Sequence, residues 1–124
     1  MNNRLKFRLW NKEIGYVENP LIYLNTKGEL VGEGENEVYK IDQKAYKVEL
    51  CTGLKDKNGK LIYEGDIIKT RQHPQNCIMV WFDNDASFSL KSTINDEYYP
   101  LYCMGMFEII GNIHDNPELM EKVK

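Results

Sequence analysis

Hydrophobic and cationic residues alternate near the start of the chain. Over residues 4–9 every second residue is apolar, and the residues between them are arginine or lysine. A period of two is typical of a β-strand that buries one face. The pattern therefore predicts an N-terminal strand whose outer face carries Arg4, Lys6 and Arg8, with Trp10 at its end.

Short apolar runs separated by glycine, asparagine and aspartate continue through most of the sequence. The Asn58-Gly59 pair between Leu54 and Leu61 supplies the residues that a tight hairpin turn requires. The run Ile78–Phe82 does not alternate and is rich in strand-forming residues, which predicts a central strand covered on both faces. In total, the pattern predicts about nine strands.

The last residues change character. Asp115 or Asn116 can cap a helix, Pro117 suits its first position, and Glu118 places an acid in its first turn. This signature predicts a short C-terminal α-helix. Because only about two turns can form in the remaining residues, the helix is expected to need docking for its stability.

Composition narrows the class of protein. The chain has 124 residues, of which 42% are hydrophobic and 28% are charged, and its formal net charge is −3. This balance is typical of a folded globular domain and argues against a wholly basic nucleic-acid-binding body. No long apolar run is present, so we expect no membrane span, no signal peptide and a cytoplasmic location.

Residues with catalytic or metal-binding chemistry are few and scattered. The three cysteines Cys51, Cys77 and Cys103 lie among apolar neighbours, which favours small buried side chains over reactive thiols. The only histidines, His73 and His114, lack the short Cys or His spacing of a zinc site. The sequence therefore predicts no catalytic residue, no cofactor and no metal.

The segment Asp83-Asn84-Asp85 is expected to form an Asx-stabilised hairpin turn, with a fragment of a hard-cation site as the alternative. His114-Asp115 could form an acid–base pair, but this dipeptide fits the cap of the last helix better. An enzyme would be expected to place His114 or Asp83 in a cleft.

Three stretches carry a family resemblance: Lys6-Phe7-Arg8-x-Trp10, the block Thr52–Ile67, and Ile110–Ile113 followed by Asn116–Leu119. Together they resemble the YopX protein family, small proteins carried by bacterial prophages and related mobile elements. Residues 25–46 lie outside this resemblance. It implies a phage or prophage origin, a bacterial host and a β-rich fold, and it brings no reaction and no catalytic residues.

The middle block of the resemblance has two interpretations. Small SH3-like barrels use Gly-Asp corners where a loop enters a strand, so its small residues predict structural turns. The residues expected to shape such turns, with one later glycine, are Gly53, Gly59, Gly65, Asp66 and Gly111. The alternative is a binding loop whose lysines contact a partner; these are Lys55, Lys57 and Lys60.

Charge is unevenly distributed along the chain. Alternate side chains on one strand face lie about 6.5–7 Å apart, close to the spacing of successive phosphates. The basic N-terminal face therefore predicts a solvated outer surface, a nucleic-acid contact or a contact with an acidic partner. A separate acidic group consists of Glu29, Glu33, Glu35 and Glu37. A basic strand of one chain meeting the acidic group of another would favour a homo-oligomer.

Together these features predict a mainly β fold: a small SH3-like, partly open barrel with an N-terminal β extension and a short C-terminal helix. Residues 1–45 are expected to pack as a β segment on a core of residues 46–124, as one folding unit. The favoured function is a non-enzymatic interaction or assembly module that forms homo-oligomers, binds an unidentified protein partner and does not bind membranes. The alternative is a nucleic-acid-binding accessory protein that uses Arg4, Lys6, Arg8 and Trp10.

Overall fold

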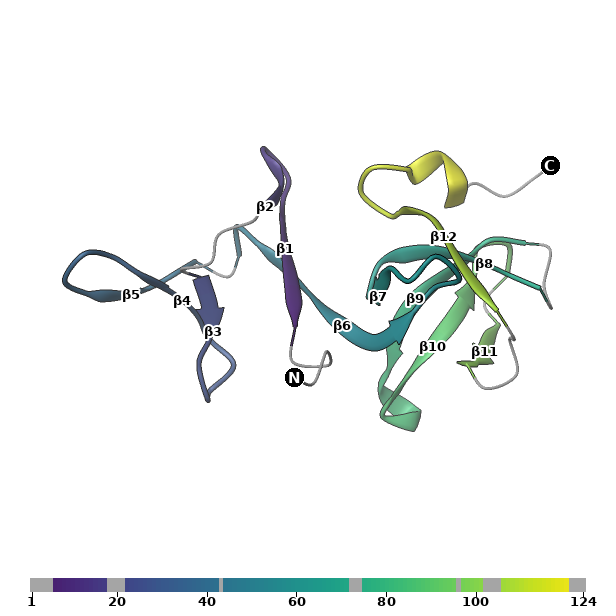
Figure 1. Ribbon diagram of the computed structural model, residues 1–124, viewed down its shortest axis with the longest axis horizontal. Helices are drawn as coiled ribbons and strands as arrows, with labels where there is room; N and C mark the ends of the chain where they lie inside the picture. The colour runs from purple at the N-terminus through teal and green to yellow at the C-terminus, as the bar shows by residue number, and fades with distance from the viewer. Residues whose placement is uncertain are drawn as a thin grey trace. The chain divides into compact units, whose positions relative to one another are not determined.

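The structure, a computed structural model, describes residues 6–17, 22–42, 44–71, 75–95, 97–101 and 106–120. Within these ranges the chain is mainly β, as the sequence predicted, and strands β1 to β12 follow one another along it (Figure 1). The chain divides into two compact units. The N-terminal unit is Arg8–Glu49, and the C-terminal unit is the rest of the described chain. The division falls within strand β6, Lys47–Lys55.

The N-terminal unit contains two small antiparallel sheets. In the first, the strands lie in the order β2-β1-β6, and the hairpin of β1 and β2 places Trp10 opposite Tyr16. In the second, the order is β3-β4-β5. The strand bounds are β1 Phe7–Asn11, β2 Gly15–Val17, β3 Ile22–Leu24, β4 Leu30–Glu33 and β5 Val38–Lys40. Among the described residues of this unit, the buried apolar side chains are Leu9, Leu30 and Val31.

The C-terminal unit is built around a five-stranded antiparallel sheet that curls into a half-barrel (Figure 1). Its strand order is β11-β10-β9-β8-β12, while β7 pairs with β6. The strand bounds are β7 Leu61–Tyr63, β8 Asp66–Thr70, β9 Cys77–Phe82, β10 Ser87–Ser92, β11 Tyr98–Pro100 and β12 Phe107–Asn112. The core cluster consists of Ile62, Ile68, Cys77, Met79 and Leu90.

Strand β9 lies in the middle of its sheet, as predicted, but only one of its faces is fully covered, so the prediction of cover on both faces is confirmed in part. Cys77 and Met79 have no exposed surface, and Trp81, on the same face near the end of the strand, is 46% exposed, whereas Ile78 and Val80 on the other face are half-buried. The half-barrel encloses one core, so the second face of β9 is only partly covered. On the core face, the ring of Phe88 packs against the cluster and meets that of Trp81 edge-on at 5.1 Å.

The predicted C-terminal α-helix is not confirmed. The described residues there form a 3-10 helix, Pro117–Met120. The N–H of Leu119 donates to the carbonyl of Asn116 at 3.0 Å, which is the spacing of a 3-10 turn. The side chain of Asn116 accepts the N–H of Asn112 and lies so close to Gly111 that a Cβ there would be 2.5 Å from its Oδ1. Gly111 therefore permits a close approach between the end of β12 and this segment.

Candidate binding surfaces

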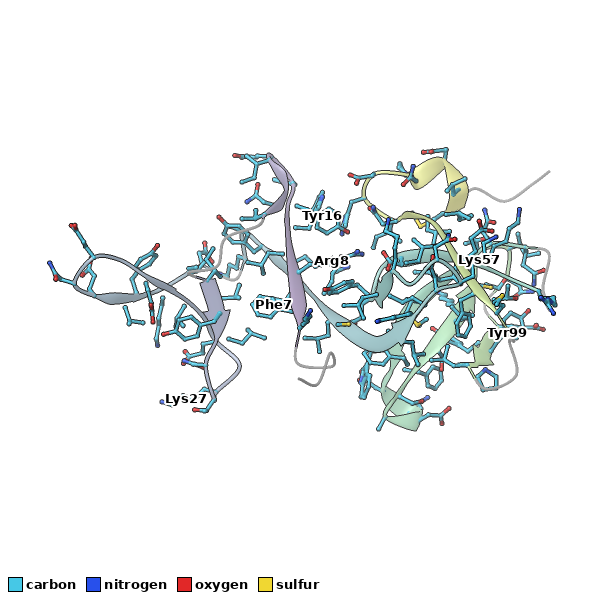
Figure 2. All side chains as sticks on the ribbon, viewed as in Figure 1. Phe7, Arg8, Tyr16, Lys27, Lys57 and Tyr99 are labelled. Carbon is cyan, nitrogen blue, oxygen red and sulfur yellow. The ribbon has the colours of Figure 1, made fainter. Side chains whose placement is uncertain are left out.

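The basic outer face predicted for the N-terminal strand is partly neutralised within the chain. The Nε of Arg8 donates to Oε1 of Glu49 at 2.8 Å, and the hydroxyl of Tyr16 donates to the same oxygen at 2.9 Å. Arg8 and Tyr16, labelled in Figure 2, come from the neighbouring strands β1 and β2. Glu49 has no exposed surface, so Arg8 compensates a buried carboxylate. Lys6 is exposed, and Arg4 lies outside the described residues. Arg8 therefore has a structural role in addition to any external contact.

The hairpin that joins β6 and β7 carries Lys55, Lys57 and Lys60, all of them exposed. The Nζ of Lys57 lies 3.3 Å from Oε2 of Glu108, and because both side chains are solvated this pair contributes about 0–1 kcal/mol. The backbone N–H of Lys57 also donates to the carbonyl of Phe107 at 2.8 Å. The hairpin is attached to β12 through its backbone, and its lysines stay accessible.

Asp56 fixes the conformation of the same hairpin. Its Oδ1 accepts the N–H groups of Asn58 and Lys60, each at 2.9 Å, and its Oδ2 accepts the N–H of Ile109 at 3.2 Å. Burial raises the pKa of this carboxyl, but the three N–H groups and the charge of Lys60 outweigh burial, so the pKa lies below its ordinary value. Asp56 is therefore held as a carboxylate that organises the backbone.

Three glycines of the middle block adopt a left-handed backbone, with φ of +84° at Gly53, +83° at Gly59 and +88° at Gly65. Gly65 lies where the chain leaves β7 and enters β8. The next residue, Asp66, is buried, and its Oδ2 accepts the N–H of Tyr63 at 2.8 Å. The block therefore has the geometry of backbone corners that hydrogen bonds hold in place.

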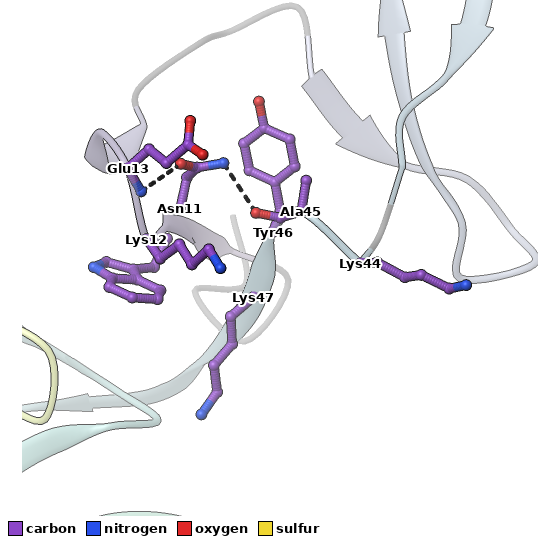
Figure 3. A pocket seen from close by; sticks show the side chains of 8 residues that line it. Asn11, Lys12, Glu13, Lys44, Ala45, Tyr46 and Lys47 are labelled. Carbon is purple, nitrogen blue, oxygen red and sulfur yellow. Dashed lines mark hydrogen bonds between the residues drawn. The ribbon is translucent and has the colours of Figure 1, made fainter.

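A pocket of about 320 Å³ lies in the N-terminal unit, between the β1–β2 turn and the segment that leads into β6 (Figure 3). Its volume is at the small end of the range for small-molecule sites, about 300–1,000 Å³. The residues that line it are Trp10, Asn11, Lys12, Glu13, Lys44, Ala45, Tyr46 and Lys47. With three lysines, one glutamate and two large aromatic rings, the pocket combines positive charge with aromatic surface.

Asn11 joins the two walls of this pocket. Its Oδ1 accepts the N–H of Glu13 at 2.8 Å and that of Ile14 at 3.3 Å, and its Nδ2 donates to the carbonyl of Ala45 at 2.9 Å (Figure 3). Hydrogen bonds to the backbone therefore define the shape of the pocket. Sequence reasoning singled out Trp10 but missed the wall before β6, because the pairing of distant strands brings that wall close and no local pattern signals it.

Strand β5 forms one edge of its sheet, and no strand in the described part of the chain pairs with its outer side. Val38 is 60% exposed and Tyr39 is 47% exposed. The Nζ of Lys40 lies 3.1 Å from Oε2 of Glu29, one of the acidic group identified above. An edge with exposed apolar side chains is a typical template for pairing with another strand.

The hydrogen bonds of β5 show which of its backbone groups point outward. On the inner side, the N–H of Ile41 donates to the carbonyl of Leu30 at 3.0 Å. Successive residues of an antiparallel strand direct their N–H and C=O groups to alternate sides. Val38 and Lys40 therefore direct their backbone groups away from β4, toward the outer edge.

Two further pockets lie on the C-terminal unit. One, of about 760 Å³, has an aromatic lining in which the rings of Phe82 and Tyr98 meet edge-on at 4.5 Å. The other, of about 290 Å³, lies beside the pair formed by Lys57 and Glu108. Neither is lined by His114 or Asp83, the residues considered for an enzyme.

The cysteines and the Asp83–Asp85 segment, the other residues considered for chemistry, have structural roles where the structure describes them. Cys51 and Cys77 are buried, as predicted. Burial raises the pKa of the Cys77 thiol to about 11. Cys103 and His73 lie outside the described residues. Asp83–Asp85 forms a 3-10 turn between β9 and β10 without a side-chain cap, so the turn is confirmed and its Asx stabilisation is not.

Within the described ranges, no three His, Cys, Asp or Glu side chains gather closely enough to hold a metal ion. The same ranges contain no helix with the length and hydropathy to cross a bilayer.

The YopX protein family model matches residues 6–121 of this chain. The crystal structure of protein EF1440 from Enterococcus faecalis is 28% identical to it, with a TM-score of 0.60 over 94% of this chain and 97% of that chain. The crystal structure of protein yopX from Bacillus subtilis is 19% identical, with a TM-score of 0.57 over 98% of this chain and 100% of that chain, and shows a likeness of fold. No curated protein matches this chain significantly.

Proposed function

This chain belongs to the YopX protein family, and from that premise we propose that it is a small interaction and assembly module of a bacterial phage or prophage, without a reaction of its own. The module acts in the host cytoplasm and forms homo-oligomers. The observation that carries the proposal is the outer edge of β5, where Val38 and Tyr39 are exposed and two residues direct backbone groups outward.

A second copy of β5 fits this edge. A two-fold axis through Tyr39 places Val38 of each copy opposite Lys40 of the other, and each such pair exchanges both of its N–H···O=C bonds. The two Tyr39 side chains then lie directly opposite each other, where exposed aromatic side chains bury the most apolar surface. This register uses every outward backbone group that β5 presents.

Charge favours the antiparallel direction. The segment before β5 carries Glu33, Glu35 and Glu37 and no lysine, whereas Lys40 and Lys44 lie in and after the strand. Antiparallel pairing places the acidic segment of one copy beside the lysine-bearing segment of the other. Parallel pairing would bring two acidic segments together, and like charges directly opposite each other are destabilising. Because β5 is short, we expect a small interface and a Kd in the micromolar range or weaker.

Several side chains that could take part in a reaction are instead engaged in holding the fold together. This supports the proposal that the chain has no reaction of its own. Asp56 and Asp66 hold backbone N–H groups, Glu49 is in a buried ion pair, and Cys77 is a buried thiol. The proposal also retains the SH3-like description of the C-terminal unit and a helical end to the chain. The curled antiparallel sheet and the 3-10 helix Pro117–Met120 support this description.

The substitution Val38→Pro tests the proposal. Proline removes one outward N–H and leaves the inward hydrogen bonds of β5 with β4 intact, because proline is tolerated at a strand edge whose N–H faces solvent. Val38→Thr is the matched control, since threonine keeps both the N–H and the branched shape. Sedimentation equilibrium from about 10 μM to 1 mM should show self-association in the wild type and in the threonine variant, and a monomer in the proline variant.

Circular dichroism and the melting temperature of the proline variant establish that it is folded. A wild-type chain that stays monomeric at the highest concentration would overturn the proposal. Self-association of the proline variant at wild-type strength would exclude the β5 edge as the interface.

A further inference from the structure

The pocket of the N-terminal unit brings together the two kinds of group that bind a nucleotide. Trp10 and Tyr46 provide aromatic surface, and Lys12 and Lys47 provide cations, while Lys44 lines the pocket but directs its side chain away from the other labelled residues (Figure 3). Aromatic rings stack on nucleobases of any sequence, and lysines attract the phosphates. We propose that this pocket binds a phosphate-linked nucleobase, which is the shared chemistry of single-stranded nucleic acid and of a free nucleotide.

The three lysines of the pocket are available to a ligand. Within the described ranges, none of Lys12, Lys44 and Lys47 forms an ion pair, in contrast to Lys40 and Lys57. In the part of the chain that the structure describes, a protein with a formal charge of −3 therefore places cations around this pocket that no ion pair engages. Such a local positive charge in an acidic protein favours a specific anionic ligand over general binding to polyanions.

Two carboxylates lie close to these lysines. Glu13 lines the pocket, and Oδ1 of Asp42 accepts the backbone N–H of Lys44 at 2.9 Å. Asp42 is therefore engaged with the backbone of one wall. Among the described residues of the lining, Glu13 is the one acid beside three lysines, so positive charge prevails there.

Hydrogen bonds within the chain hold the two walls of the pocket together. Figure 3 shows Lys12 on the β1–β2 turn and Lys47 on β6, so that the cations come from both walls. Asn11 connects these walls through its bonds to Glu13 and Ala45. Preorganised groups lose less conformational entropy on binding than groups on free loops do.

The aromatic rings distinguish a nucleobase from a simple anion. Inorganic phosphate would need only the lysines, whereas a nucleobase also stacks on a ring, at about 1–3 kcal/mol per base in measured cases. The chain has two tryptophans, Trp10 in the pocket and Trp81 in the C-terminal unit. Trp81→Phe therefore leaves Trp10 as the only tryptophan that reports on the pocket by fluorescence.

The experiment titrates the Trp81→Phe variant of the full chain with a short oligothymidylate, with thymidine monophosphate and with inorganic phosphate. We expect the fluorescence of Trp10 to be quenched by the first or the second ligand and not by phosphate. No quenching by the oligonucleotide and the mononucleotide would overturn the proposal, and so would quenching by phosphate at equal affinity. Much tighter binding of the oligonucleotide identifies single-stranded nucleic acid, and equal affinities identify a free nucleotide.

Substitutions of single residues distinguish binding in the pocket from binding elsewhere on the surface. Trp10→Leu should weaken binding of the ligand identified above by about ten-fold or more, measured by fluorescence anisotropy with a labelled ligand. Lys12→Ala and Lys47→Ala should each weaken binding and, with an oligonucleotide, reduce the salt slope by about 0.7. Lys27→Ala is the matched control, because Lys27 is an exposed lysine of the same unit outside the pocket lining.

An effect of Lys27→Ala equal to those of the pocket lysines would show non-specific attraction and overturn the assignment. Circular dichroism establishes that each variant is folded. None of the substituted residues lies in β5, so failure of this proposal leaves the self-pairing of β5 standing, and the reverse also holds.

Discussion

Asp56 shows how one side chain can determine the conformation of a hairpin. Its carboxylate accepts three backbone N–H groups and is 7% exposed. In Asp56→Asn the amide nitrogen cannot accept a hydrogen bond, so at least one N–H loses its partner. We expect the free energy of unfolding to fall by about 1–3 kcal/mol at pH 7, as measured by urea denaturation.

The effect of Asp56→Asn should depend on pH. The pKa of Asp56 is lower in the folded chain than its ordinary value of 3.8. The stability that this carboxylate contributes is therefore complete above that value and is lost as the pH falls through the lower, folded pKa. The difference between the two proteins should shrink below about pH 4. A difference that stays constant with pH would contradict a role for the charge, and exposed Asp83→Asn is the control.

Glu49 illustrates what residue patterns cannot predict. Apolar and charged residues alternate over residues 46–50, which is typical of a strand with a charged outer face, yet Glu49 is fully buried and Leu50 beside it is 40% exposed. The reason is the ion pair with Arg8 and the hydrogen bond from Tyr16. These partners come from another hairpin, and nothing in the residues around position 49 indicates them. By contrast, the burial of Cys51 and Cys77 could be predicted, because the apolar residues that indicate it are their neighbours in the sequence.

At the scale of elements, the corner between β7 and β8 gives the sharpest prediction. Gly65 has φ of +88°, its N–H donates to the carbonyl of Met79 at 2.8 Å, and its own carbonyl accepts the N–H of Ile113 at 2.9 Å. A side chain is strained in this conformation, so Gly65→Ala should lower the free energy of unfolding by about 1–2 kcal/mol. In a chain of this size, the melting temperature should fall by about 3–10 °C.

Gly34→Ala is the matched control for this corner. Gly34 has no positive φ, and a Cβ there would meet only ordinary contacts, the nearest at 3.6 Å. The same change should be neutral or slightly stabilising, because alanine restricts the unfolded chain. Equal melting temperatures for Gly65→Ala and the wild type would show that the corner tolerates a side chain.

Elements whose signals are local were predicted well. The alternation near the start indicated β1, and Asn58-Gly59 indicated the β6–β7 hairpin. The C-terminal α-helix was not confirmed. The capping signature is local, but Oδ1 of Asn116 accepts the N–H of Asn112, and the N–H of Leu119 donates to the carbonyl of Asn116 with the spacing of a 3-10 turn. The outer edge of β5 depends on which strands pair, and strand pairing is not encoded in any single stretch.

At the scale of the whole molecule, the two proposals fall on the unit with the smaller core. In the described N-terminal unit the buried apolar side chains are Leu9, Leu30 and Val31, and this unit holds both the pocket of Figure 3 and the free edge of β5. The C-terminal unit has the larger cluster and the glycine corners predicted from the small residues of the middle block. From this contrast we expect the C-terminal unit to be the more stable scaffold and the N-terminal unit to carry the proposed binding surfaces.

Hydrogen exchange followed by mass spectrometry should reveal this contrast. Amides with few buried apolar neighbours exchange through local opening, whereas amides in a packed core exchange only on larger unfolding. We therefore expect β4 and β5 to exchange faster than β8 and β9. Raising the protein concentration should slow hydrogen exchange in β5, because self-pairing covers the outward N–H groups of Val38 and Lys40. Protection of the β5 peptide that rises with concentration, with β8 and β9 unchanged, is the expected result. Equal exchange in the two units would contradict the contrast, and protection of β5 that is independent of concentration would contradict the pairing.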